Sequence, residues 1–151
     1  MEQLTAQVDV AVIGAGTMGT GIAEVLARSG HSVRIVDSRS GSASAAIDRI
    51  AKTLGRDISR DRLEAHEAHR IVGRLRPVDS IADLAGCGLV IESVAEDLAV
   101  KRDVLRAAEE AAGQGVGHEV LLATNTSSIS VTAVAAALSR PELLVGLHFF
   151  N

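Results

Sequence analysis

The sequence predicts an α/β fold built on a doubly wound, mostly parallel sheet. Short apolar runs rich in β-branched residues alternate along the chain with segments whose apolar residues repeat at helical spacing. Most of the apolar runs end in a glycine, an acid, a hydroxyl residue or a histidine, and the carboxyl ends of parallel strands share one edge of a sheet. The predicted strands are 8–13, 32–36, 75–78, 88–91, 120–123 and 143–147.

The first strand runs directly into Gly14-Ala15-Gly16-Thr17-Met18-Gly19, which is a G-x-G-x-x-G motif. A segment with helical periodicity follows up to Gly30, and the second strand then ends at Asp37. This order of strand, glycine turn, helix, strand and acid is the dinucleotide-binding βαβ unit of the Rossmann fold. The complete order is far more specific than the glycine motif alone.

Each residue type in this unit suits a dinucleotide. Gly14 permits a sharp turn, Gly16 lets the backbone approach a pyrophosphate, and Gly19 lets the helix pack closely on the strand. The N-terminus of the helix attracts phosphate. Asp37 is placed to accept hydrogen bonds from the adenine ribose and to repel a 2′-phosphate, which favours NAD over NADP, while Arg39 is a weaker opposing influence. The predicted cofactor-binding residues of the unit are Gly14, Gly16, Thr17, Met18, Gly19 and Asp37.

Two helices, 43–54 and 60–72, are predicted as a helical-pair insertion between the second and third strands. Ser59 is the expected N-cap of the second helix. The pair is either a solvated surface feature or a hairpin that contacts the bulky part of a substrate. His66 and His69 can share a face of the second helix, but without a third ligand they do not predict a metal site.

The remaining elements continue the alternation of strands and helices. Pro77 assigns the third strand to an edge of the sheet. The helix after the fourth strand opens with Glu96-Asp97, and acids are favourable at a helix N-terminus. The predicted helical segments in this part of the chain are 80–85, 98–112 and 130–138.

Composition limits the classes of function. The chain has 151 residues, 47% hydrophobic residues and a net charge of −4, which suits one soluble domain and disfavours a nucleic-acid surface. The apolar runs are much shorter than a membrane span, and Met1-Glu2-Gln3-Leu4 does not resemble a signal peptide. The single cysteine, Cys87, excludes an internal disulfide and suits a reducing compartment. We therefore expect a cytoplasmic protein that binds neither nucleic acid nor membrane and holds no metal.

Polar residues gather at the predicted carboxyl ends of the strands, where an open doubly wound sheet binds its ligands. His148 follows the sixth strand and is suited to accept the hydroxyl proton of an alcohol, because an unperturbed imidazole titrates near about 6.5. Ser127 and Asn125 follow the fifth strand and can hydrogen-bond the reacting oxygen or the nicotinamide. On these residues alone, His148 could equally tie down a chain end, and Ser127 could cap the next helix.

Segments in all parts of the sequence resemble one known family. They are Val-Ile-Gly-Ala-Gly-Thr-Met-Gly at 12–19, Val-Ile-Glu-Ser-Val-Ala-Glu at 90–96 with Lys101, Thr-Asn-Thr-Ser-Ser at 124–128 and Gly-Leu-His-Phe-Phe-Asn at 146–151. Together they are similar to the NAD-binding domain of the 3-hydroxyacyl-CoA dehydrogenases. The resemblance implies the NAD-dependent oxidation of an L-3-hydroxyacyl-CoA to the 3-oxoacyl-CoA, with substrates from fatty acid β-oxidation of short chains or from aromatic degradation.

The resemblance also implies roles for single residues. His148 matches the catalytic base, Ser127 a substrate-binding serine, and Asn151 a polar residue of the active site. Glu96 and Lys101 match residues near the nicotinamide end of the cofactor and the coenzyme A. These two residues and Asn125 complete the predicted cofactor-binding set. Glu92 is expected to be structural.

The resemblance implies more protein than residues 1–151, which we expect to form the NAD-binding domain. In the family a helical second domain carries a glutamate that orients the histidine, builds the acyl pocket and forms a homodimer. Phe149 and Phe150 are the only phenylalanines of a chain that lacks tryptophan and tyrosine, and they lie beside its last residue. We therefore expect further chain to cover these two large apolar side chains. The 151 residues alone are therefore expected to be inactive. The alternatives are a standalone, non-catalytic NAD-binding module and a related dehydrogenase that acts on a sugar acid.

Overall fold

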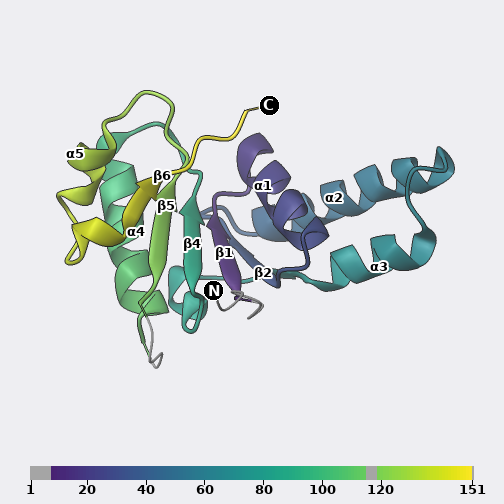
Figure 1. Ribbon diagram of the computed structural model, residues 1–151, viewed down its shortest axis with the longest axis horizontal. Coiled ribbons are helices and arrows are strands. Elements are labelled where there is room, and N and C mark those ends of the chain that lie inside the picture. The colour runs from purple at the N-terminus through teal and green to yellow at the C-terminus, as the bar shows by residue number, and fades with distance from the viewer. Residues whose placement is uncertain (1–7, 115–118, 151) are drawn as a thin grey trace, which may run out of the picture.

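The computed structural model describes residues 8–114 and 119–150 of the chain. Its centre is a six-stranded sheet in the order β3-β2-β1-β4-β5-β6, in which every neighbouring pair is parallel (Figure 1). The chain changes direction across the sheet between β1 and β4, as in doubly wound folds, so the predicted fold class is confirmed. The strands are β1 (Val10–Ile13), β2 (Val33–Val36), β3 (Leu75–Pro77), β4 (Leu89–Glu92), β5 (Leu121–Thr124) and β6 (Leu144–Gly146).

Helices cover both faces of the sheet (Figure 1). One face packs against α1 (Thr17–Arg28), α2 (Ser42–Ser59) and α3 (Ala65–Gly73). The other face packs against η1 (Ile81–Leu84), α4 (Leu98–Ala112) and α5 (Val131–Ala135). A short helix, η2 (Pro141–Leu143), precedes β6. Along β1, Val10 and Val12 face the first group, and Ala11 and Ile13 face the second. Burial on both faces explains why the sequence of this strand is almost continuously apolar.

The predicted helical insertion between β2 and β3 is present, with different boundaries. α2 is longer than expected, and Ile58 in its last turn packs against the core. The expectation that Ser59 caps the second helix is wrong, because Ser59 ends α2 and its hydroxyl donates to the carbonyl oxygen of Arg56 at 2.9 Å. The chain reverses near Asp61, which has a φ of 54°, and α3 begins only at Ala65. In Figure 1 the helical pair extends away from the sheet.

Other local features follow from the sequence. β3 lies at an edge of the sheet with Pro77 as its last residue, and Ser80 forms a capping box with Asp83 at the start of η1.

None of the helices in the described ranges is long and apolar enough to cross a membrane. The same ranges hold no group of three or more His, Cys, Asp or Glu side chains that could bind a metal ion.

Candidate cofactor and active site

The strand register brings the predicted site residues to one edge of the sheet. Ile13 pairs with both Val36 and Glu92, Glu92 pairs with Thr124, and Thr124 pairs with Gly146, so these residues form one row. The residue that follows each of them therefore lies one step further out along the same edge. From β2 to β6 these residues are Asp37, Gly14, Ser93, Asn125 and Leu147, and His148 comes directly after.

The glycine loop, residues 14–19, needs its glycines for two different reasons. Gly14 has a φ of +105°, and a Cβ there would lie 2.2 Å from the carbonyl oxygen of Ser93. A Cβ at Gly19 would lie 1.8 Å from the carbonyl oxygen of Gly14, so both positions are closed by protein backbone. A Cβ at Gly16 would meet no heavy atom of the described residues within 4 Å. The space in front of Gly16 is thus open to a ligand, as a bound pyrophosphate requires.

The start of α1 suits the same ligand. Gly16 is its N-cap, the described residues supply no side-chain hydrogen bond to this cap, and the first turn contains no acid. The amide groups and the positive end of the helix dipole are therefore available to a phosphate. The glycine loop and α1 fit the phosphate groups of NAD.

Asp37 lies where a ribose-binding acid is expected, and its side chain also binds the backbone of the glycine loop. One carboxylate oxygen accepts the amide hydrogen of Ala15 at 2.8 Å, and the other accepts that of Arg39 at 2.9 Å. Burial alone raises the pKa of Asp37, but these hydrogen bonds and the Arg39 guanidinium outweigh it, so the pKa lies below its ordinary value. The side chain is therefore an anion at neutral pH, able to accept ribose hydroxyls.

A first cavity of about 440 Å³ opens beside Asp37 and fits an adenosine group. It lies between the glycine loop, the end of β2, η1 and the start of α4, and Gly14, Ser93 and Asp37 contribute to its lining. Its apolar walls offer contacts to a flat aromatic base, with the carboxylate of Asp37 at one side. The apolar lining residues are Ile13, Val36, Ile81, Val94, Ala95, Val100 and Val104.

A second cavity of about 380 Å³ gathers most of the predicted site residues. The glycine loop and the start of α1 form one side, and the ends of β4, β5 and β6 form the other. Ser93 and Val94, which follow β4, line both cavities, so the two adjoin at the end of this strand. The predicted site residues that line the second cavity are Gly16, Thr17, Met18, Glu96, Asn125, Ser127 and His148. Asn151 lies outside the described residues.

His148 is an exposed residue whose backbone is held on both sides. The amide of Leu147 donates to the carbonyl oxygen of Thr124 at 3.0 Å, and the amide of Phe149 donates to the side-chain oxygen of Asn125 at 2.9 Å. Asn125 also donates through Nδ2 to the hydroxyl of Ser93 at 3.3 Å. Asn125 therefore lines the second cavity and joins the ends of β4, β5 and β6 at the same time.

Glu96 anchors the turn that carries Ser127. Its Oε1 accepts the amide hydrogens of Ser127 and Ser128, each at 3.1 Å, and also the hydroxyl hydrogens of Thr126 and Ser128. Burial alone raises the pKa of Glu96, but these hydrogen bonds and the charge of Lys101 lower it from 4.5 to about 2. An ionised Glu96 therefore positions the turn at neutral pH.

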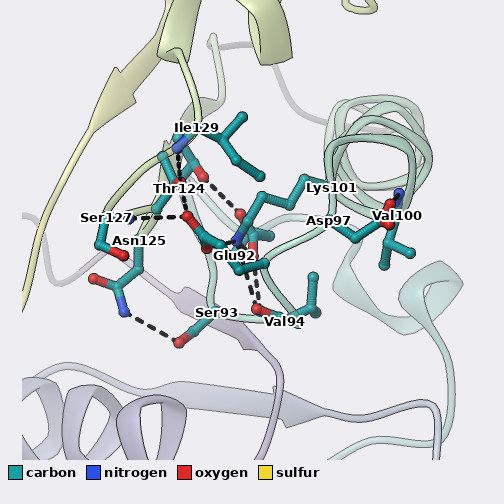
Figure 2. Close-up of polar contacts among 12 residues, drawn as sticks. Glu92, Ser93, Val94, Asp97, Val100, Lys101, Thr124, Asn125, Ser127 and Ile129 are labelled. Atoms are coloured by element: carbon teal, nitrogen blue, oxygen red, sulfur yellow. Dashed lines mark hydrogen bonds and ion pairs between the residues drawn. The ribbon is translucent and has the colours of Figure 1, made fainter.

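Lys101, which the resemblance places near the cofactor and the coenzyme A, lies in a buried ion pair. Its side chain is fully buried, as is that of Glu92, so its ammonium reaches neither cavity. The Nζ atom lies 2.7 Å from Oε1 of Glu92 (Figure 2). It also lies 3.3 Å from Oε2 of Glu96. Among the predicted site residues within the described ranges, the fold also buries Gly14 and Gly19, but Lys101 is the charged one with a fully buried side chain. The expectation that Glu92 is structural agrees with its burial.

Arg49 is a site residue that sequence reasoning missed. It lies on α2, and its Nη2 donates to the carbonyl oxygen of Ala15 at 2.7 Å and to the hydroxyl of Thr20 at 3.0 Å. The helical insertion is thereby tied to the glycine loop. An arginine on an amphipathic helix is usually a solvated charge, so the sequence holds no signal for this contact.

The fold and the two adjoining cavities define a dinucleotide-binding domain with a histidine at the far end of its binding edge. The chain belongs to the family described as 3-hydroxyacyl-CoA dehydrogenase, NAD binding domain, whose model matches residues 9–151. The family identifies NAD as the cofactor, in agreement with the open glycine loop and the Asp37 carboxylate.

Several characterised proteins are similar to this chain. A 3-hydroxyadipyl-CoA dehydrogenase of Escherichia coli is 46% identical over 94% of the chain and 29% of its own length. A 3-hydroxybutyryl-CoA dehydrogenase of Mycobacterium tuberculosis is 40% identical over 94% of the chain and 49% of its own length. The crystal structure of a 3-hydroxybutyryl-CoA dehydrogenase from Escherichia coli superposes with a TM-score of 0.89 and 45% identity, over 95% of this chain and 30% of that one. The chain thus spans half or less of the length of these relatives.

Proposed function

We propose that the protein oxidises an L-3-hydroxyacyl-CoA to the 3-oxoacyl-CoA with NAD as hydride acceptor. The observation that carries this proposal is the second cavity, where His148 and Ser127 stand opposite the glycine loop. A dinucleotide whose pyrophosphate lies against Gly16 and whose adenosine fills the first cavity has its nicotinamide end in the second cavity. The similarity to a 3-hydroxyadipyl-CoA dehydrogenase and a 3-hydroxybutyryl-CoA dehydrogenase supports the substrate class, for which we favour short-chain and aromatic-degradation 3-hydroxyacyl-CoA compounds.

NAD, when bound, supplies the acceptor for the hydride that leaves C3 of the substrate. His148 takes the proton of the 3-hydroxyl group on an imidazole nitrogen as the C–H bond breaks and the carbonyl forms. The products are the 3-oxoacyl-CoA, NADH and a proton that the imidazole passes to water. Imidazole suits this task because its ordinary pKa, about 6.5, allows it to accept and release a proton near neutral pH.

The other site residues bind or orient. Ser127 holds the substrate oxygen by a hydrogen bond, and Glu96 keeps the turn that carries it in place. Asn125 stands at the nicotinamide end and fixes the backbone beside His148. Asp37 binds the adenine ribose and disfavours the 2′-phosphate of NADP. Asn151 completes the set as a polar group beside the substrate.

The proposal includes a second domain, helical and following residue 151, that covers the acyl group, carries the acid that orients His148 and forms a homodimer. The lengths of the relatives support it, since this chain matches 29% of one and 49% of another. Residues 1–151 alone then bind NAD but turn over no substrate. We place the protein in the cytoplasm, where the thiol of the buried Cys87 stays reduced.

The test is NAD reduction by the protein together with any residues that follow Asn151 in its gene. The L and D isomers of 3-hydroxybutyryl-CoA and a free sugar acid are offered in parallel, and NADH is followed by its absorbance. We expect reduction with the L isomer and none with the D isomer or the sugar acid. Turnover of the sugar acid alone would overturn the substrate class. NAD binding without any turnover would show a non-catalytic module.

A further inference from the structure

Arg49 lies on α2, yet its guanidinium group binds the glycine loop. The nearby side chains of Ala46 and Ile50 are buried in the core, so the helix that carries Arg49 has a fixed position against the sheet. From this helix the Nη2 atom donates to the carbonyl oxygen of Ala15 at 2.7 Å. A charged side chain of the helical insertion thus reaches the cofactor loop, in a contact that the proposed chemistry does not use.

The carbonyl group of Ala15 depends on side chains for its hydrogen bonds. Ala15 is 2% exposed, and its oxygen accepts no backbone amide hydrogen from the described residues. Its donors are Nη2 of Arg49 and, at a longer distance of 3.3 Å, the hydroxyl group of Thr20. A buried carbonyl without a partner costs free energy, and a hydrogen bond from a charged donor is the stronger kind. Arg49 is therefore the main partner that fixes the direction of this carbonyl.

The peptide unit that Arg49 binds leads directly into the start of α1. The amide group of Ala15 donates to the carboxylate of Asp37 at 2.8 Å, so both polar groups of this residue are held by side chains. Its peptide bond to Gly16 is trans, so the amide of Gly16 points away from the carbonyl that Arg49 holds. Gly16 is the N-cap of α1 and lines the second cavity. A rotation of this peptide unit therefore redirects the Gly16 amide and shifts the first amides of α1.

We propose that Arg49 is a positioning residue through which α2 sets the glycine loop for the pyrophosphate of the dinucleotide. The guanidinium fixes the direction of the loop amides before the ligand arrives, and such preorganisation lowers the cost of binding. The inference rests on the proposed function in one respect, namely that the pyrophosphate lies against Gly16. It gives the helical insertion a part in cofactor binding.

The test compares two ligands that share their adenosine group, with the protein and any residues that follow Asn151 in its gene. ADP-ribose carries the pyrophosphate and adenosine does not, and calorimetry gives the affinity for the first and NMR titration that for the second. The variants are Arg49→Met and Thr20→Val. The matched control is Lys52→Met, which removes one positive charge from the exposed face of the same helix. Thr20→Val removes the other donor to the Ala15 carbonyl and carries the same prediction if Arg49→Met fails to fold.

We expect Arg49→Met to weaken ADP-ribose binding by about tenfold, the equivalent of one hydrogen bond to a charged group. Adenosine binding should weaken by no more than about twofold, because Asp37 keeps its second contact, to the amide of Arg39. Lys52→Met should bind both ligands as the wild type does. Unchanged affinity for ADP-ribose, or equal losses for both ligands, would leave Arg49 a structural role at most and would overturn the proposal.

Salt separates positioning from a direct attraction between charges. The hydrogen bond to the loop is internal to the protein, so the difference between Arg49→Met and the wild type should persist at about 0.5 M salt, where exposed charges are largely screened. A difference that disappears at this salt concentration would show direct attraction of the phosphates and would overturn the positioning role.

Gly16→Ala tests the placement of the pyrophosphate separately. This variant should also weaken ADP-ribose binding, because its methyl group occupies the space in front of the loop. Wild-type affinity in Gly16→Ala together with a loss in Arg49→Met would contradict the placement against Gly16 and leave the role of Arg49 standing. A loss in Gly16→Ala together with wild-type affinity in Arg49→Met would overturn the role of Arg49 alone.

Discussion

We expect the variant Gly16→Ala to weaken cofactor binding while it leaves folding nearly unchanged. The added Cβ meets no described heavy atom within 4 Å, and the φ of −72° at this residue is normal for alanine. The remaining cost is the weaker N-cap preference of alanine, so we expect the free energy of unfolding to fall by about 1 kcal/mol or less. The methyl group instead occupies the space in front of the backbone where the pyrophosphate must approach.

The loss of affinity can be sized from the hydrogen bonds at stake. Displacing the pyrophosphate from one amide donor costs about 1.5–3 kcal/mol, because the acceptor is charged. NAD binding by Gly16→Ala should therefore weaken about 10- to 100-fold. Calorimetry measures the affinity and urea unfolding the stability, with Gly21→Ala on the exposed side of α1 as the control that keeps wild-type affinity. Wild-type affinity in Gly16→Ala would refute the placement of the pyrophosphate.

Three further predictions follow from the same edge of the sheet. Asp37→Ala should weaken NAD binding by about tenfold or more, because hydrogen bonds to a charged acceptor are lost, and equal affinity by calorimetry would exclude the ribose role. Gly19→Ala should lower the free energy of unfolding by about 3 kcal/mol, because its Cβ would lie 1.8 Å from the backbone oxygen of Gly14. Gly21→Ala should instead raise the free energy of unfolding by up to about 1 kcal/mol. Similar urea midpoints for the two variants would contradict this packing. The pKa of Glu96 lies at about 2 in the folded protein against an ordinary value of 4.5, so its stabilising contribution is full above pH 4.5 and is lost as the pH falls toward 2. Unfolding measured across this range should show that Glu96→Gln removes part of the acid sensitivity, and identical profiles would disprove the assignment.

The fold could be predicted because several levels of the sequence agree. The strands are buried on both faces and read as apolar runs, and short right-handed crossovers leave few possible orders for a parallel sheet. The row that runs through Ile13, Glu92 and Thr124 then places the residue after each strand at a common edge. The convergence of Asp37 and His148 on that edge therefore follows from local signals alone.

The features that the sequence did not reveal depend on contacts between segments that are distant in the chain. Ser59 has the residue type of an N-cap, but the packing of Ile58 extends α2 past the predicted end, so the local signal loses to tertiary contacts. Lys101 is followed by ordinary charged residues on α4, and only the fold shows that it turns inward toward Glu92. Arg49 shows the same limit, since its acceptor is the backbone of the glycine loop.

The proton acceptor is the point on which the whole interpretation depends. His148→Ala, measured with L-3-hydroxybutyryl-CoA and NAD in the protein with any residues that follow Asn151, tests it most directly. We predict that kcat falls by about 10²- to 10⁴-fold, the usual contribution of general base catalysis, while the affinity for NADH stays unchanged. An unaltered kcat would show that the imidazole at the end of β6 is not the base.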